Sequence, residues 1–236
     1  MNIEKYLILN KYFLSLFGVS EARELFSKLK DVKEGFDSDG RSYFINTLRG
    51  FENLKISKYN LPEYDQNIQS YVRKISFGRE MVNLKYFQYL AVLFTEVFLD
   101  NLKNRKNKFL NELNEFLKNY KQEQEIKLID PFTESDLQKL AFWMATGSGK
   151  TLIMHINYYQ FLNYKLFSPG NIILITPNEG LSKQHFEELQ RSGVPCRLYT
   201  GSLNGGLRNE NEVLVIEMTK FVEEKKGRGV TLPVNV

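Results

Sequence analysis

One short glycine-rich segment constrains this chain more than any other. Residues 145–151 read Ala-Thr-Gly-Ser-Gly-Lys-Thr; the apolar run LAFWMA (140–145) leads into them, and the largely apolar run TLIMHINYYQFL (151–162) follows. A glycine loop between an apolar strand and an apolar helix is the setting in which such a loop binds phosphate. The pattern therefore predicts strand, loop and helix over 140–162. Trp143 is expected to pack within that strand.

The residue types of this loop suit an oligophosphate and a divalent cation. Gly147 and Gly149 let the main chain wind closely around phosphate groups, and inward-pointing amides and the helix N-terminus add positive potential. Lys150 is predicted to reach the β- and γ-phosphates, and the Thr151 hydroxyl to bind Mg²⁺. The alternative is a glycine-rich turn that only starts a helix. The predicted binding residues are Thr146, Gly147, Ser148, Gly149, Lys150 and Thr151, with Lys150 and Thr151 also in the catalytic role.

The same strand-and-helix rhythm continues towards the C-terminus. Apolar runs at 171–177 (NIILITP), 194–199 (VPCRLY) and 212–219 (EVLVIEMT) flank a helical pattern at 179–190. A Ser168-Pro169-Gly170 break precedes them. Continuous apolar strands that alternate with helices indicate a parallel sheet covered on both faces. The predicted fold class is therefore α/β, a P-loop NTPase (RecA-like) parallel sheet with flanking helices, incomplete and preceded by a helical N-terminal region.

The first 80 residues read as short helices. Helices are predicted over 3–16, after Ser20 as the capping residue, over 41–48, and from Pro62 onward. The first of these ends at Gly18, a residue suited to a left-handed cap. Nothing in this region has catalytic spacing. The basic residues Arg73, Lys74 and Arg79 are expected to form a solvated edge.

A long helical segment comes next. Residues 84–100 (LKYFQYLAVLFTEVFLD) are apolar on two faces, which predicts a buried helix, and Gln88 within it must find hydrogen-bond partners. Residues 101–127 are polar apart from one thin stripe, so we predict an inserted surface helical hairpin there. Thr133 and Asp136 form a loose capping box for a short helix. The thin stripe consists of Leu110, Leu113, Phe116 and Leu117.

Composition excludes several classes of protein. The chain has 236 residues, of which 42% are hydrophobic, and one cysteine, so it cannot form an intrachain disulfide. This favours a reducing compartment, and we expect a cytoplasmic protein. No apolar run approaches the roughly 18–20 residues of a membrane-spanning helix. The net charge of +4 permits a nucleic-acid partner without arguing for one, and the basic run Lys103, Arg105, Lys106 and Lys108 is read as a solvated helix end.

Three segments carry a family resemblance. FWMATGSGKT resembles the first motif of superfamily 2 helicases (DEAD/DEAH-like), in the version found in restriction-enzyme motor subunits. Met144 stands where the general pattern has glycine, which points away from small GTPases and nucleotide kinases. The stretches LKYFQYLAVLFTEVFLD and DLQKLAFWMATGSGKTLIMHIN are similar to type III restriction Res subunits, and ILITPNEGLSKQH resembles helicase motif Ia. The resemblance covers 80–236 and nothing before it.

This resemblance implies a domain organisation, ligands and further site residues. The residue pattern predicts a helical region at 1–80, and the resemblance implies a partial first motor domain at 81–236 with a helical insert at about 101–130. ATP, Mg²⁺, DNA and a modification methyltransferase are the implied partners. Gln88 resembles the glutamine that reads the adenine edge, with a core amide bonded to backbone as the alternative. Pro177, Asn178 and Ser182 match the region that contacts the DNA backbone, with an ordinary capped turn as the alternative, and Thr219 resembles a further strand contact.

Other residues of interest are read as structural, and one acidic motif is missing. His155 is expected to be a bonded core histidine and His185 a helix-surface residue, and two histidines with one cysteine do not favour a zinc site. The chain has no Asp-Glu dipeptide, and Glu217 is the nearest substitute for the acid that holds the metal. We therefore expect an N-terminal fragment that binds nucleotide weakly and hydrolyses almost none. An unrelated P-loop ATPase or kinase and a truncated, non-catalytic interaction module remain as alternatives.

Overall fold

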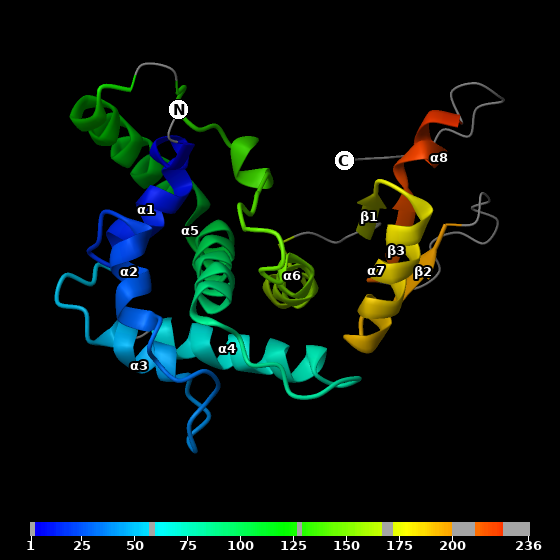
Figure 1. Ribbon diagram of the computed structural model, residues 1–236. Helices are drawn as coiled ribbons and strands as arrows, with labels where there is room; N and C mark the ends of the chain where they lie inside the picture. Colours follow the sequence, from blue (N-terminus) through cyan, green and yellow to red (C-terminus); the bar gives the residue numbers. More distant parts are fainter. Residues whose placement is uncertain (1–2, 57–59, 127–128, 167–171, 200–210, 224–236) are drawn as a thin grey trace. The chain divides into compact units, whose positions relative to one another are not determined.

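A computed structural model describes residues 3–56, 60–126, 129–166, 172–199 and 211–223 (Figure 1). The chain divides into two compact units. The helical unit comprises Met1–Arg73 and Val82–Leu166, and the sheet unit comprises Lys74–Met81 and Phe167–Val236. This division differs from the domain boundary near residue 80 that the sequence predicts. The predicted Ser168-Pro169-Gly170 break lies outside the described residues.

Short helices build the N-terminal part of the helical unit, as predicted. Gly18 has a positive φ of 71°, consistent with its predicted place at the end of the first helix. Pro62 lies in the first turn of its helix, where its missing N–H removes no helical hydrogen bond. The elements are a 3-10 helix Ile3–Tyr6, α1 Ile8–Leu16, α2 Ala22–Leu29, α3 Tyr43–Arg49 and α4 Asn60–Ile75.

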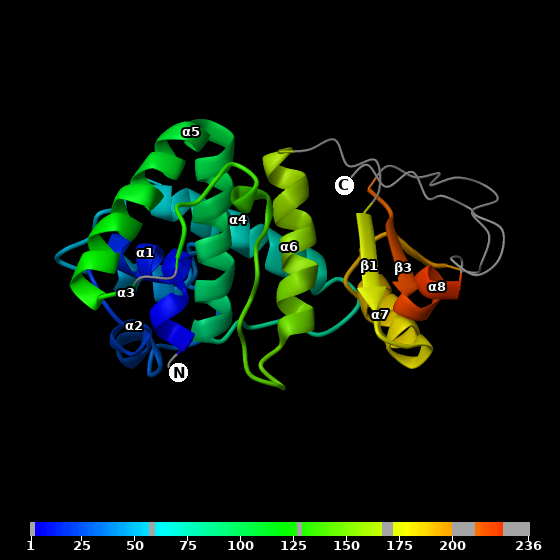
Figure 2. The same ribbon diagram turned by 90° about the horizontal axis from the view of Figure 1, so that it is seen from above.

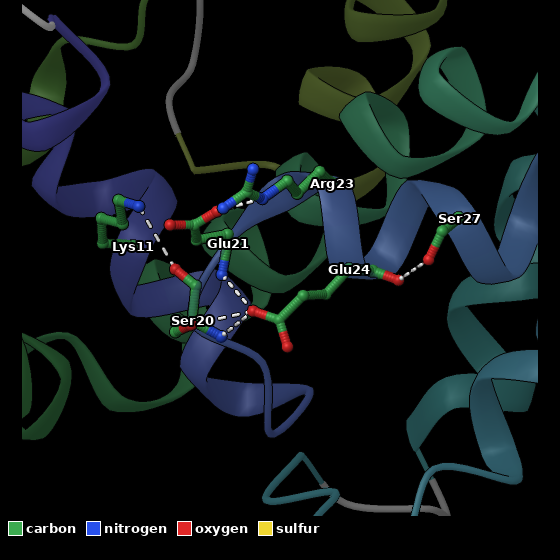
Figure 3. A network of polar contacts seen from close by, with 6 residues as sticks. All are labelled: Lys11, Ser20, Glu21, Arg23, Glu24 and Ser27. Carbon is green, nitrogen blue, oxygen red and sulfur yellow. Dashed lines mark hydrogen bonds and ion pairs between the residues drawn. The ribbon is translucent and has the colours of Figure 1, made fainter.

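The turn between α1 and α2 closes differently from the prediction (Figure 3). Glu21, not Ser20, is the N-cap of α2, and it forms a capping box with Glu24. The Glu24 Oε1 atom accepts hydrogen bonds from the backbone N–H of Glu21 (2.9 Å) and from the Ser20 hydroxyl (2.8 Å). These bonds lower the pKa of the Glu24 carboxyl, and the bond from the Ser20 hydroxyl has the largest effect. The longer side chain of Glu24 reaches back over the helix start, so Ser20 becomes a partner of the cap.

The longest helix, α5 (Tyr86–Gln124), folds back on itself. Arg105 has non-helical φ and ψ angles of −153° and 38°, and Figure 2 shows two arms on either side of this break. The predicted hairpin over 101–127 is therefore wrong, because the buried helix is itself the first arm. Of the predicted stripe, Leu113 and Leu117 are buried, Leu110 and Phe116 are half-buried, and Phe109 joins the buried side chains.

The second arm of α5 is part of the core and not a surface insertion. The Tyr12 hydroxyl of α1 donates to Glu112 Oε2 at 3.1 Å, and the Tyr12 ring lies 5.8 Å from that of Phe109 and 5.7 Å from that of Phe116. Phe109 is fully buried. The contacts of Tyr12 therefore join the N-terminal helix to the second arm of α5.

The segment before the phosphate loop is not a strand. A short 3-10 helix spans Asp136–Gln138. The Thr133 N–H and the Thr133 hydroxyl both donate to the Asp136 carboxylate, as the capping box predicts. Residues 140–145 then form no ladder with any described strand, and Trp143 is 72% exposed. The predicted strand and the predicted packing of Trp143 are both wrong, because an apolar run sets a preference for strand but does not supply a pairing partner. The helix after the loop, α6 Lys150–Tyr164, forms as predicted.

One buried carboxylate ties three helices of this unit together. Glu96 of α5 has no exposed surface. Its Oε1 accepts from Gln160 Nε2 of α6 at 2.7 Å, and its Oε2 accepts from the Tyr164 hydroxyl of α6 at 2.9 Å and from Asn67 Nδ2 of α4 at 3.1 Å. A buried charge is tolerated only when donors surround it in this way. The helix that begins at the phosphate loop is thus fixed to α4 and α5.

The sheet unit confirms the predicted α/β class. In the part of this unit that the structure describes, three strands are parallel in the order β1-β3-β2, with Ile172 and Cys196 both opposite Val213. All residues from Val213 to Ile216 are buried, as expected for a central strand, and α7 contacts all three strands (Figure 1). The elements are β1 Ile172–Thr176, α7 Glu179–Arg191, β2 Cys196–Leu198, β3 Val213–Glu217 and α8 Met218–Glu223. Among the described residues, no helix has the length and apolarity to cross a bilayer.

The network around Glu96 gives a stability prediction. In Glu96→Gln, an amide nitrogen replaces one carboxylate oxygen and faces an N–H donor of Gln160 or Asn67. We expect the free energy of unfolding in urea to fall by about 1–3 kcal/mol, the cost of an unsatisfied buried polar group. Glu115→Gln, at an exposed position of the same helix, is the matched control and should change it by less than about 0.5 kcal/mol. Equal effects of the two changes would contradict the role of Glu96.

This network also has a pH dependence. Burial raises the pKa of Glu96 above its usual value of 4.5, against the opposing effect of its hydrogen bonds. Because the folded protein holds the proton more tightly, the stability that Glu96 contributes is complete at low pH and is lost as the pH rises through its folded pKa. The difference in unfolding free energy between wild type and Glu96→Gln should therefore shrink from about pH 5 to about pH 8. A difference that grows over this range would contradict the account.

Candidate nucleotide-binding site

The phosphate loop, residues 145–151, has the backbone that its glycines predict. Gly147 and Gly149 have φ angles of 77° and 85°, in the left-handed region. A Cβ atom at Gly147 would meet nothing within 4 Å, so the space beside this residue is open. A Cβ at Gly149 would lie 2.4 Å from Gln88 Nε2, so a larger residue there must displace the end of the Gln88 side chain. The loop is therefore tightly held at one glycine and open at the other.

Free backbone donors surround the start of α6. Gly149 is the N-cap of this helix, and no side chain caps it. The first N–H groups of a helix have no partner within the helix, and together with the helix dipole they favour an anion. The Ser148 hydroxyl points back to the Ala145 carbonyl at 2.7 Å. The Ser148 N–H donates to the same carbonyl at 3.3 Å, so the main-chain amides offered to a ligand are those at the start of α6.

Lys150 is folded back onto the loop. Its Nζ donates to the carbonyl oxygens of Met144 (3.1 Å) and Ala145 (2.9 Å), and the residue is exposed. Bonds from an exposed ammonium to two carbonyls are readily exchanged for bonds to a phosphate, which carries full negative charge. Thr151 is half-buried in the first turn of α6. The residue types and the open space therefore fit a phosphate chain with Mg²⁺.

Gln88 joins the start of α5 to the phosphate loop. Its Oε1 accepts from the backbone N–H of Lys85 at 2.9 Å, and its Nε2 donates to the Ser148 carbonyl at 2.9 Å. The side chain is 9% exposed. The structure thus gives Gln88 the backbone-bonded role that the sequence offers as an alternative. Reading of adenine by Gln88 stays a prediction.

Both histidines lie on helices and are at least partly buried. His155 lies one turn beyond Thr151 on α6 and is fully buried, as predicted for a core histidine. His185 is half-buried on α7, less exposed than predicted, and burial lowers its pKa. Within the described ranges, no group of three or more His, Cys, Asp or Glu side chains is arranged to hold a metal ion.

The turn from β1 into α7 holds the residues matched to motif Ia. Asn178 caps α7, because its Oδ1 accepts from the Leu181 backbone N–H at 2.9 Å. Ser182 is 5% exposed, and its hydroxyl bonds with the hydroxyl of Thr176 and donates to the Asn178 carbonyl at 3.2 Å. Ser182 therefore shapes the turn from inside, which does not fit direct contact with a DNA strand. Pro177 and Asn178 are exposed.

Two further predicted residues follow the central strand. Thr219 is exposed on α8, the short helix after β3. Glu217 is the last residue of β3 and lies opposite Thr176 of β1, so it does stand at a strand end as predicted. The parallel register therefore brings Glu217 to the same edge of the sheet as the turn into α7.

The basic run on α5 is largely engaged in ion pairs. Arg105 pairs with Glu112 at 3.0 Å, Lys106 pairs with Glu134, and Lys108 lies 3.9 Å from Glu112. Lys103 Nζ lies 5.8 Å from the ring centroid of Tyr164. These contacts agree with the reading of the run as a surface feature of the fold.

Two side chains, Glu96 and Arg79, have structural roles that the sequence patterns do not predict. The burial of Glu96 could have been predicted, because Glu96 is an acid inside a helix that is apolar on two faces. Arg79, which the sequence assigns to a solvated edge, forms an ion pair and hydrogen bonds with the end of α7, and its side chain is 25% exposed. Nothing local in the sequence indicates this contact.

Comparison with protein families identifies the chain. Residues 99–230 match the family described as "Type III restriction enzyme, res subunit", and this match covers more than half of the 236 residues. The chain belongs to this res-subunit family. Comparisons with curated proteins and with solved structures give no match.

The family match places the described features in context. The phosphate loop, α7 and β3 all lie within the matched range of the res-subunit family, whereas Gln88 and the N-terminal helices precede it. The match supports an incomplete P-loop NTPase-like fold and a helicase-like nucleotide-binding module. The N-terminal helices therefore add to the res-subunit match a region whose helix α4 is linked, through Glu96, to the helix of the phosphate loop.

The two loop glycines give a graded prediction. Gly147→Ala meets only the strain of a left-handed φ, and we expect it to weaken Mg-ATP binding by roughly ten-fold. Gly149→Ala also displaces Gln88 and should weaken binding by roughly a hundred-fold or more. Gly180→Ala on α7, where a Cβ has ordinary contacts, is the control. Titration with a fluorescent ATP analogue measures all three, and an equal loss for both loop variants would contradict the contact with Gln88.

Proposed function

We propose that this chain is the ATP-binding part of an ATP-dependent DNA helicase or translocase of a type III restriction system. The observation that carries the proposal is the phosphate loop, open beside Gly147 and facing the uncapped amides of α6. A loop with this backbone, followed by Lys150 and Thr151, is suited to the phosphates of a nucleotide. The family match supplies the helicase-like context.

The loop residues have separate roles in this proposal. The loop and the amides at the start of α6 surround the β-phosphate, and Lys150 leaves its two carbonyl partners to bind the β- and γ-phosphates. Thr151 holds Mg²⁺, which offsets phosphate charge when bound. Gln88 keeps Ser148 in place and is our candidate contact to adenine. In the intact protein these groups serve ATP hydrolysis.

The DNA-binding side of the proposal lies in the sheet unit. The start of α7, with exposed Pro177 and Asn178, presents a helix N-terminus suited to a DNA phosphate, and Thr219 is a further candidate contact. Ser182 supports this turn from within. A modification methyltransferase is the proposed protein partner, and the single cysteine fits a cytoplasmic location.

A second candidate is a nucleotide-binding module without catalysis. The observation that favours it lies at the end of the central strand β3, which carries one acid, whereas hydrolysis in this superfamily uses an acidic pair on the metal and the water. Glu217 supplies a single acid at a strand end. The two candidates share nucleotide binding and differ in turnover, so binding is the property to test first.

Lys150→Ala tests the shared claim. We expect it to reduce the affinity for Mg-ATP by at least roughly a hundred-fold, since a lysine that bonds phosphate directly is worth several charge-assisted hydrogen bonds. The fold should persist because Lys150 is exposed. The control is Lys139→Ala, at an exposed lysine before the loop, and calorimetric titration gives both affinities. Unchanged binding in Lys150→Ala would refute the phosphate site.

The salt dependence of DNA binding tests which basic residues contact phosphates. Lys106 is paired with Glu134, so Lys106→Ala should leave the slope of log Kd against log salt concentration unchanged. Fluorescence anisotropy with a labelled DNA duplex measures the slope. A slope smaller by about one would place Lys106 in the DNA interface instead.

A further inference from the structure

A short segment between α4 and α5 belongs to the sheet unit. We call residues 76–81 the strap. The helical unit holds the chain up to Arg73 and again from Val82, whereas Lys74–Met81 clusters with the sheet unit. The sequence predicts nothing for this segment beyond a solvated edge. The strap is therefore a part of the N-terminal region that is built into the unit of α7.

The strap binds the C-terminal end of α7. The Gly78 N–H donates to the Arg191 carbonyl at 3.1 Å, and Arg79 Nη2 donates to the Glu188 carbonyl at 3.1 Å and to the Ser192 hydroxyl at 2.8 Å. Arg79 Nη1 also lies 3.3 Å from Glu188 Oε2. The Gly78 bond satisfies a carbonyl in the last turn of the helix, and Arg79 adds a second donor to the Glu188 carbonyl, which also accepts from the Ser192 N–H at 3.1 Å. The positive charge of Arg79 complements the helix dipole.

Gly78 shows how closely the strap approaches the helix. A Cβ atom at this residue would lie 2.6 Å from the Arg191 carbonyl oxygen and 3.1 Å from its Cα. Both neighbours are backbone atoms, so neither can turn aside. Glycine at 78 and arginine at 79 are thus two independent requirements for the same contact.

The strap continues directly into the residues that hold the phosphate loop. Lys85 N–H bonds Gln88 Oε1, and Gln88 Nε2 bonds the Ser148 carbonyl. The link from Met81 to Lys85 spans at most about 14 Å of extended chain. Phosphate bound to the loop changes the strength of the bond between Gln88 and the Ser148 carbonyl, and through Gln88 and this short link the change reaches the segment that Arg79 fixes to α7.

We propose that Arg79 is a positioning residue that couples nucleotide binding at the phosphate loop to DNA binding at α7. This rests on the proposed function, which assigns nucleotide to the loop and DNA to the N-terminus of α7. Arg79 touches neither ligand. It holds the end of α7 opposite to Asn178, so that nucleotide and DNA each change the affinity for the other, as linkage requires.

The coupling is measured as a ratio of affinities in the whole chain. The Kd of a fluorescent ATP analogue with Mg²⁺ is determined with and without a saturating single-stranded DNA oligonucleotide. We expect the wild type to show a ratio of roughly five-fold or more. Arg79→Ala and Gly78→Ala should bring this ratio to one while each ligand alone binds within about two-fold of wild type. Arg191→Ala, which removes an exposed partner of the same Glu188, should keep the wild-type ratio.

Hydrogen exchange supplies a readout that needs nucleotide alone. Nucleotide should alter the exchange of the strap amides in wild type and Arg191→Ala, and should leave it unaltered in Arg79→Ala. A wild-type ratio in Arg79→Ala or Gly78→Ala, or a strap that does not respond to nucleotide in wild type, overturns the coupling. Nucleotide binding without DNA binding would refute the DNA part of the proposed function, and the exchange result would then decide the role of Arg79 by itself.

Discussion

The helical unit depends on the burial of one carboxylate. Glu96 has no exposed surface, so its oxygens must receive donors from the protein, and these come from α4 and α6. The same bonds fix the orientation of α6, whose first residue is Lys150. The N-terminal helices precede the part of the chain that matches the res-subunit family, yet they help to place its phosphate loop.

The loop itself combines a rigid and an open side. Gln88 restrains Ser148 and lies where a Cβ at position 149 would be, whereas a Cβ at Gly147 would meet nothing within 4 Å. Such a loop loses little conformational freedom when phosphate binds, because its left-handed residues are already in place. Lys150 is the part that must move, from two carbonyl oxygens to the ligand.

Local patterns in the sequence predict much of this structure. The glycine loop, the helix after it, the parallel strands and the Asn178 cap all follow from residues close together in the chain. The strand predicted at 140–145 does not form, because an apolar pattern does not specify the strand with which it would pair. Packing between distant segments produces the fold-back of α5 at Arg105 and the bonds of Arg79 to α7. The periodicity of residues along the chain does not predict such packing. Gln88 lies between these cases, because its need for partners is predictable and their identity is not.

The central claim is that this loop binds the phosphates of ATP in the conformation it already has. A crystal structure of the chain with Mg²⁺ and a non-hydrolysable ATP analogue tests it most directly. We predict that the β-phosphate lies within residues 146–150, that Gly147 and Gly149 keep positive φ angles, and that Lys150 Nζ leaves the Met144 and Ala145 carbonyls for phosphate oxygens. A nucleotide bound elsewhere, or a Lys150 that keeps both carbonyl bonds with the analogue present, would contradict the account.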